Sequence, residues 1–230
     1  MTRRSQAVCS GMLCGALPIA AWAHQVAGSD AAYLQSVHGV QVGPLAYLGA
    51  KHMMTGYDHL LYLAGITFFL YRLRDVAAYV TLFAVGHSIT LLLGVLAGVH
   101  VDAHAVDAVI GLSVVYKAVE NIGGLRRPGW SISPRAAVLA FGLAHGLGLA
   151  TKLQELHLPT AGLVGNMLAF NVGVELGQLA ALILIWLVLQ AWRRRPAFAR
   201  QALVANVVLM GAGFVLFEYQ LTALLLTRAH

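Results

Sequence analysis

Ionisable side chains recur inside the apolar stretches of this chain. His52, Asp58 and His59 share one stretch, His87 lies in the next and His145 in a later one. Each ionisable residue at the centre of a membrane helix costs ~2.5–3.5 kcal/mol on insertion scales, so such residues need a reason to be there. Imidazole nitrogens and carboxylate oxygens, without thiolate, are ligands that suit divalent transition metals. The pattern predicts a metal site inside a membrane.

Helical spacing adds a second group of polar residues. His52 and His59 are seven residues apart, which places them two turns apart on one face of a continuous helix. Asn171, Glu175 and Gln178 follow an i, i+4, i+7 pattern, and we expect this face also to point into the bundle. The predicted metal ligands are His52, Asp58, His59, His87, His145 and Glu175.

Further polar residues are expected around this site or along a path to it. They are Ser88, Asp107, Ser113, Lys117, Glu120, Asn121, Asn171 and Gln178. Lys117 and Glu120 stand at i, i+3, a spacing at which opposite charges pair on a helix. Two interpretations are open for this pair: a salt bridge that joins helices, or the inner gate of a path whose outer site is the histidine cluster.

Composition identifies the elements that must position these residues. Of 230 residues, 59% are hydrophobic and only 10% are charged, against roughly 25% charged in soluble domains. The mean hydropathy is +0.75. We therefore predict an all-α, polytopic membrane bundle of about six transmembrane helices. Their expected ranges are near 45–72, 76–98, 104–123, 134–154, 161–192 and 200–227.

The basic residues indicate how this bundle is oriented. The net charge is +6, but the arginines form short clusters in alternate loops and no basic face interleaved with aromatics is visible, which argues against nucleic acid as a partner. Because Lys and Arg gather in cytoplasmic loops, both termini are expected on the extracytoplasmic side. The arginines that mark the cytoplasmic side are Arg72, Arg74, Arg126, Arg127, Arg135, Arg193, Arg194, Arg195 and Arg200.

The first 23 residues have the features of a signal peptide. Arg3 and Arg4 precede an apolar stretch, and Ala21-Trp22-Ala23 forms an A-x-A cleavage site. Cleavage there would remove both cysteines and leave an extracytoplasmic amino terminus. The alternative is an uncleaved first transmembrane helix. Residues 24–42 are expected to form a short extracytoplasmic lead-in and residues 43–230 the transmembrane domain.

Several motifs carry a resemblance to a known family. Gly49-Ala-Lys-His52-Met-Met-Thr-Gly56-Tyr-Asp58-His59 resembles the H-x-x-x-G-x-D-H signature of the HupE/UreJ family of bacterial membrane proteins. The similarity continues through Gly86-His87-Ser88, Val106-Asp107 to Glu120-Asn121, Phe141 to Gly148, and Phe170 to Gln178.

This resemblance implies a function in metal supply. Members of the family are described as hydrogenase or urease accessory proteins and as permeases for nickel or other divalent metals. It implies uptake of a divalent transition metal ion (Ni, Zn, Fe, Mn or Co) across the bacterial inner membrane by a protein embedded in the lipid bilayer. Met53 stands where the nickel branch has a proline, so the chain is more similar to the second branch.

Other functions remain open beside a permease. The same groups would suit a proton or ion relay, or hydrogen bonding that only joins helices. An intramembrane zinc-dependent hydrolase is the alternative from another class, because His and Asp on several helices also hold catalytic zinc. No G-x-x-x-x-G-K-[ST] loop is present to drive a nucleotide-dependent pump. A homo-oligomer is compatible with all of these functions.

Overall fold

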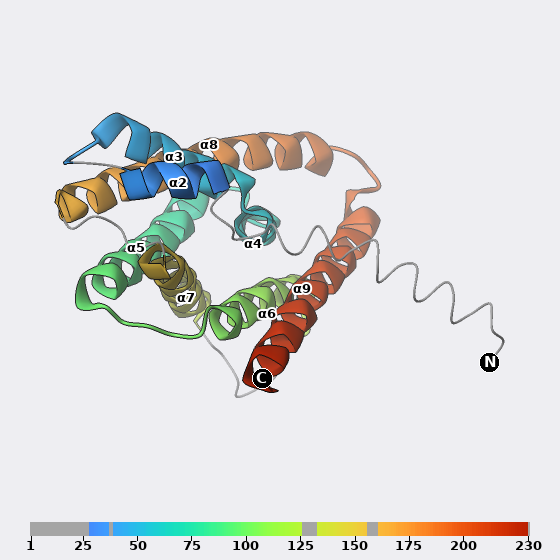
Figure 1. Cartoon of the computed structure of the whole chain (residues 1–230). Helices are drawn as coiled ribbons and strands as arrows, with labels where there is room; N and C mark the ends of the chain where they lie inside the picture. The colour runs from blue at the N-terminus through green and yellow to red at the C-terminus, as the bar shows by residue number, and fades with distance from the viewer. Residues whose placement is uncertain (1–27, 37–38, 126–132, 156–160, 230) are drawn as a thin grey trace.

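The computed structural model describes residues 28–36, 39–125, 133–155 and 161–229, and these fold into helices joined by short connections (Figure 1). The predicted all-α class is confirmed. The helices are α2 (Gly28–Ser36), α3 (Val42–Thr55), α4 (Tyr57–Thr67), α5 (Leu73–Ala97), α6 (Ala103–Asn121), α7 (Pro134–Glu155), α8 (Leu163–Arg193) and α9 (Phe198–Ala229). The predicted signal peptide lies outside the described residues.

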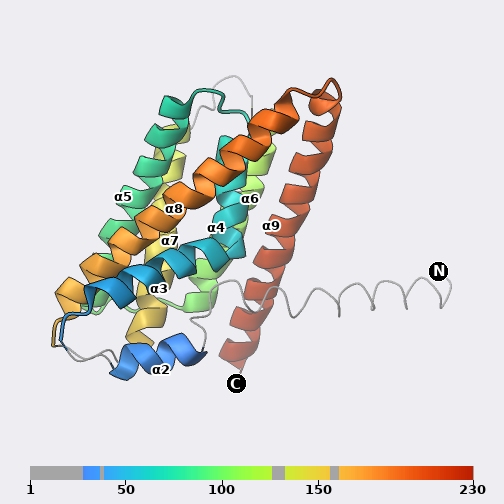
Figure 2. The ribbon, with the colours of Figure 1, turned by 90° about the horizontal axis from the view of Figure 1, so that it is seen from above.

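The long helices form a bundle with two distinct ends (Figure 2). One end carries the turn between α5 and α6 together with the last residues of α9, and α2 lies across it. We call it the α5–α6 end. The opposite end carries the turn between α8 and α9 and is called the α8–α9 end.

Within the described part of the chain, four helices are long and apolar enough to cross a membrane, namely α5, α7, α8 and α9. The number of six expected from the sequence is therefore not established. α6 has only 19 residues, and Asp107, Lys117 and Glu120 lie within it. α3 and α4 have 14 and 11 residues, so each is too short to span ~30 Å of hydrocarbon at 1.5 Å per residue.

The helix expected near 45–72, which is long enough to include a kink, is divided into α3 and α4, because the chain bends at Gly56. This residue ends α3 and begins α4 with an extended backbone, φ −72° and ψ 103°. A Cβ atom built on Gly56 would lie 2.5 Å from Nδ1 of His59 and 3.2 Å from Oδ1 of Asp58. Only glycine leaves room for the imidazole there, so the bend and the position of His59 depend on each other.

Small residues hold the helices together in close pairs. α3 packs on α8, α5 on α7 and α6 on α9. A Cβ atom at Gly49 or Gly173 would clash with the backbone of the partner helix in the first pair. One at Gly86 would lie 2.7 Å from the Leu139 carbonyl oxygen in the second pair. The Gly-rich segment 141–148 packs on α5 in this way, because a Cβ atom at Gly142 or Gly146 would clash with the backbone of Phe83 or His87.

Candidate metal centre

The first turn of α4 carries two of the predicted ligands. Asp58 and His59 are 2% and 1% exposed and lie two and three residues after Gly56. Nδ1 of His59 lies 3.2 Å from Oδ1 of Asp58. The amino-terminal end of a helix favours a negative charge, which helps to keep a carboxylate there. The Asp58 carboxylate in turn orients the His59 ring so that Nε2 carries the lone pair.

α5 and α7 supply one histidine each, because these two helices approach closely. A Cβ atom at Gly146 would clash with the carbonyl oxygen of His87, so the absence of a side chain brings the two backbones together. The His145 ring centroid consequently lies 5.1 Å from that of His59, and the His87 centroid lies 6.3 Å from it.

The hydrogen bond of His145 fixes which of its nitrogens can bind a ligand. Nδ1 lies 2.7 Å from the carbonyl oxygen of Phe141, an atom that only accepts. Nδ1 therefore donates, and in the neutral ring Nε2 keeps the lone pair. His87 differs, since neither of its ring nitrogens has a hydrogen-bond partner among the described residues although the side chain is only 1% exposed.

His52 comes closer to His59 than its spacing predicted. Seven residues of continuous helix would separate the two by about 10 Å along the axis, at 1.5 Å per residue. The ring centroids are instead 5.2 Å apart, because the bend at Gly56 turns α3 back toward the start of α4. The structure thus gathers His52, Asp58, His59, His87 and His145 from four helices, and we call these five residues the histidine cluster.

Three members of the cluster have the geometry of a metal site. Asp58, His59 and His145 each offer one ligand atom, and these atoms lie within 4.8 Å of one another. All three side chains are buried. Two imidazoles with one carboxylate, each oriented by a second hydrogen bond, form a donor set that suits a divalent transition metal.

Glu175 does not belong to this group. It lies on the exposed side of α8, whereas Asn171 and Gln178 on the same helix are 5% and 1% exposed. The i, i+4, i+7 pattern spreads over the edge of the buried face, and Glu175 falls just beyond it. The structure therefore corrects the prediction that Glu175 is a metal ligand.

The other predicted polar residues lie in separate places. Ser88 is half-buried on α5, and Ser113 is buried and donates to the Ile110 carbonyl oxygen at 2.6 Å. Gln178 donates to the Val80 carbonyl oxygen at 3.3 Å and so joins α8 to α5. Neither side-chain amide atom of Asn171 has a hydrogen-bond partner in the described part of the chain.

A second polar group lies nearer the α8–α9 end, and we call Lys117, Glu120, Asn121 and Asn206 the inner polar group. Nζ of Lys117 lies 2.8 Å from Oε2 of Glu120, as the i, i+3 spacing predicted. Nδ2 of Asn121 donates to the Gly65 carbonyl oxygen at 2.9 Å and to Oδ1 of Asn206 at 2.8 Å. These contacts join α4, α6 and α9.

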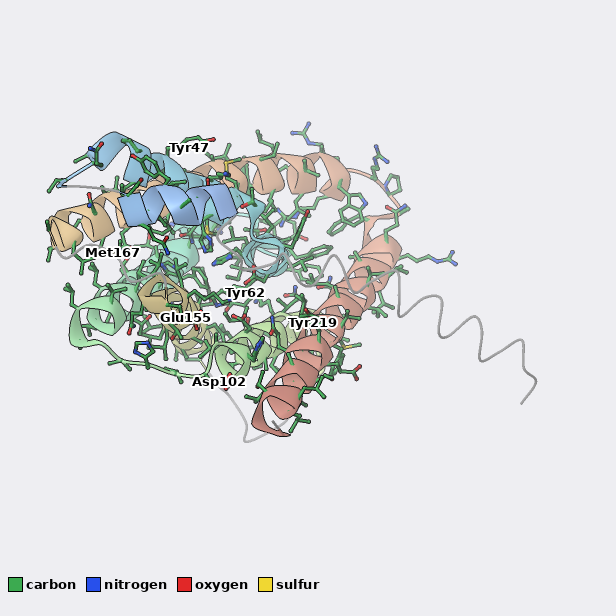
Figure 3. All side chains as sticks on the ribbon, in the orientation of Figure 1. Tyr47, Tyr62, Asp102, Glu155, Met167 and Tyr219 are labelled. Carbon is green, nitrogen blue, oxygen red and sulfur yellow. The ribbon has the colours of Figure 1, made fainter. Side chains whose placement is uncertain are left out.

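Sequence reasoning missed Tyr62 and Lys152. Tyr62 is 1% exposed and lies inside the bundle (Figure 3), with its ring centroid 5.6 Å from that of His145 and 5.4 Å from that of Phe83. Lys152 lies in α7, where Nζ is 2.6 Å from Oδ2 of Asp107. Its spacing of seven residues from His145 was the signal that it shares that face.

The family comparison agrees with this geometry. The chain matches the family model described as HupE / UreJ protein over residues 28–228. The chain belongs to the HupE/UreJ family. No match was found among curated proteins or among solved structures.

Membership connects the cluster with metal handling. The HupE/UreJ family is associated with nickel or cobalt transport or with the maturation of metal enzymes. In this HupE/UreJ chain, the His and Asp side chains around the bend at Gly56 offer nitrogen and oxygen donors that suit such an ion.

Proposed function

We propose that this protein binds a divalent transition metal ion, nickel or similar, within the bacterial inner membrane and carries it across as a permease that supplies metal enzymes. The ion is the substrate. Asp58, His59 and His145 bind it, and His52 and His87 complete or exchange with this set as the ion moves. The observation that carries the proposal is the convergence of three ligand atoms within 4.8 Å in a buried site.

The charge distribution supports an orientation for uptake. Arg72, Arg74 and Arg135 lie at the α8–α9 end with Arg193, Arg194, Arg195 and Arg200. Since basic residues favour the cytoplasmic side, the α8–α9 end faces the cytoplasm. The α5–α6 end, with α2 and the last residues of α9, then faces outward, and both termini of the mature chain are extracytoplasmic. The cluster lies between the two ends.

The burial of the cluster supports a carrier that must change conformation. Tyr62, Phe83 and Phe141 pack beside His145 and His87, with Tyr62 and Phe141 centroids 5.7 Å apart. These rings separate the cluster from the inner polar group, since Gly65, one turn after Tyr62, accepts the hydrogen bond of Asn121. An ion bound at the cluster would reach the cytoplasmic half only after the aromatic rings move.

Uptake by purified protein in liposomes tests the function. We expect flux of one or more ions from a panel of Ni²⁺, Co²⁺, Zn²⁺, Fe²⁺ and Mn²⁺, and its loss in the His59→Ala variant. His100→Ala is the matched control, because His100 is exposed at the α5–α6 turn. Flux that is absent for every ion, together with one tightly retained zinc per chain, would overturn transport in favour of the zinc-dependent hydrolase.

A further inference from the structure

A charged network lies between the histidine cluster and the α5–α6 end. Oδ2 of Asp107 on α6 accepts from Nζ of Lys152 on α7 at 2.6 Å and from Nε2 of Gln220 on α9 at 3.3 Å. Oε1 of Gln220 lies 2.8 Å from Nδ1 of His104, in the first turn of α6. The network therefore extends from a half-buried histidine near the surface to a carboxylate that is 6% exposed.

The Asp107 carboxylate has one oxygen to spare. Oδ1 is buried and has no hydrogen-bond partner among the described residues, while Oδ2 holds both contacts. A carboxylate that served only to join helices would be expected to use both oxygens, because a buried oxygen without a partner costs ~1–3 kcal/mol. The spare oxygen is a vacant acceptor for a cation.

The network is aligned with the cluster along one face of α7. His145, Gly148 and Lys152 follow an i, i+3, i+7 spacing, so they lie in a row about 10 Å long at 1.5 Å per residue. The middle position has no side chain, and a Cβ atom at Gly148 would lie 3.5 Å from Oδ1 of Asp107. The spare oxygen thus lies beside Gly148, between Lys152 and His145 along α7, together with the side chains of Val106 and Ile110.

From these contacts we propose that Asp107 is a second binding site for the transported divalent cation, outward of the histidine cluster, with the Lys152 ammonium as its resting counter-ion. This inference rests on the proposed function. An arriving cation displaces the ammonium from the carboxylate, binds there, and then moves past Gly148 to His145 and His59. When it leaves Asp107, Lys152 returns and its positive charge opposes backward movement of the ion.

Equilibrium binding of Co²⁺ to the purified full chain distinguishes this site from a structural salt bridge. We expect one bound equivalent in the native protein and two in Lys152→Met, because that change leaves the Asp107 carboxylate without its competing ammonium. The double variant Asp107→Asn/Lys152→Met should return to one equivalent. Lys51→Met is the matched control, since Lys51 pairs with Asp30 at 2.7 Å outside this network, and it should bind one equivalent.

Co²⁺ uptake into liposomes supplies the second measurement. The double variant removes both charges together and so avoids a lone buried charge, which destabilises the fold. We expect its uptake at limiting Co²⁺ to fall at least tenfold, with the equivalent at the histidine cluster retained. Native uptake in the double variant, or one equivalent in Lys152→Met, would overturn the second site and leave the proposed function standing. A native protein that binds none of Ni²⁺, Co²⁺, Zn²⁺, Fe²⁺ and Mn²⁺ would overturn both.

Discussion

The histidine cluster and the inner polar group both place polar side chains inside the bundle, but they differ in how well those side chains are paired and buried, since Lys117 and Glu120 are 12% and 24% exposed. In the inner polar group, Lys117 is paired with Glu120, and Asn121 is bonded to Asn206 and to the Gly65 carbonyl oxygen. Asn206 also donates to the Ala202 carbonyl oxygen at 2.9 Å. Near the cluster, both nitrogens of His87 and both amide atoms of Asn171 lack hydrogen-bond partners among the described residues.

This difference separates a structural role from a binding role. A buried polar group without a partner costs ~1–3 kcal/mol, and the cost is lower only if something else supplies the missing contact. The inner polar group recovers that cost within the protein by joining α4, α6 and α9. In the cluster, the two ring nitrogens of His87 have no hydrogen-bond partner among the described residues, which is what the proposed binding of a ligand would supply. Lys117 and Glu120 pair with each other within α6, so their salt bridge does not itself join helices, and both interpretations that the sequence left open for this pair stay predictions.

The largest effect is expected from removing one ligand of the cluster. His145→Ala removes one ligand from the histidine cluster, namely the ring whose Nδ1 donates to the Phe141 carbonyl oxygen. We therefore expect the Kd for Co²⁺ to rise more than about 100-fold. This rise exceeds the 10–100-fold loss of metal affinity that is typical when a residue that only orients a ligand is removed. Equilibrium dialysis measures the change, and His100→Ala should bind as the native protein does. If His145→Ala bound Co²⁺ as tightly as His100→Ala, the histidine cluster would not differ from the inner polar group as a metal-binding region.

A large effect is also expected from Gly56→Ala, which alters no ligand. The new Cβ would lie 2.5 Å from Nδ1 of His59, so the ring must move away from Asp58 and from His145. We expect the Kd for Co²⁺ to rise about 10–100-fold, as when an orienting contact is lost. Gly43→Ala is the control, because a Cβ there meets nothing within 4 Å. An unchanged Kd in Gly56→Ala would show that the bend does not position the site.

The fold class and most of the site could be predicted from the sequence, for physical reasons that these residues illustrate. His87 and His145 stand out because an ionisable residue in an apolar stretch is costly and therefore rare. The family match over residues 28–228 agrees with the motifs that surround them. The small residues beside them, Gly86 and Gly146, lie where α5 and α7 pack closely.

The position of the bend at Gly56 could not be predicted, because an isolated glycine is tolerated within a helix. The bend brings His52 close to His59 and divides the first predicted helix. The position of Glu175 was also beyond the sequence, since a residue at the edge of a helix face is buried or exposed according to its neighbours. The contact of Lys152 could not be predicted, because its partner Asp107 is 45 residues away in the chain.

A smaller effect, on stability alone, is expected from Asn206→Ala in the inner polar group. This change leaves Asn121 with one contact fewer, and the loss of a buried partner costs ~1–3 kcal/mol. We expect a lower Tm in detergent and a Kd for Co²⁺ equal to that of the native protein. Thermal unfolding and equilibrium dialysis on the same preparation test both. A weakened Kd at unchanged Tm would mean that the inner polar group belongs to the metal site.

The smallest effect is expected from Glu175→Gln, which tests the boundary of the cluster. The side chain is exposed on α8, so removing its charge takes no donor from the buried site and leaves no buried group unpaired. We expect a Kd for Co²⁺ within about twofold of native, a free-energy change of no more than ~0.4 kcal/mol. A loss of affinity as large as that of His145→Ala would require α8 to rotate Glu175 inward when the ion binds. The cluster would then be assembled by the metal and not by the packing of α4, α5 and α7.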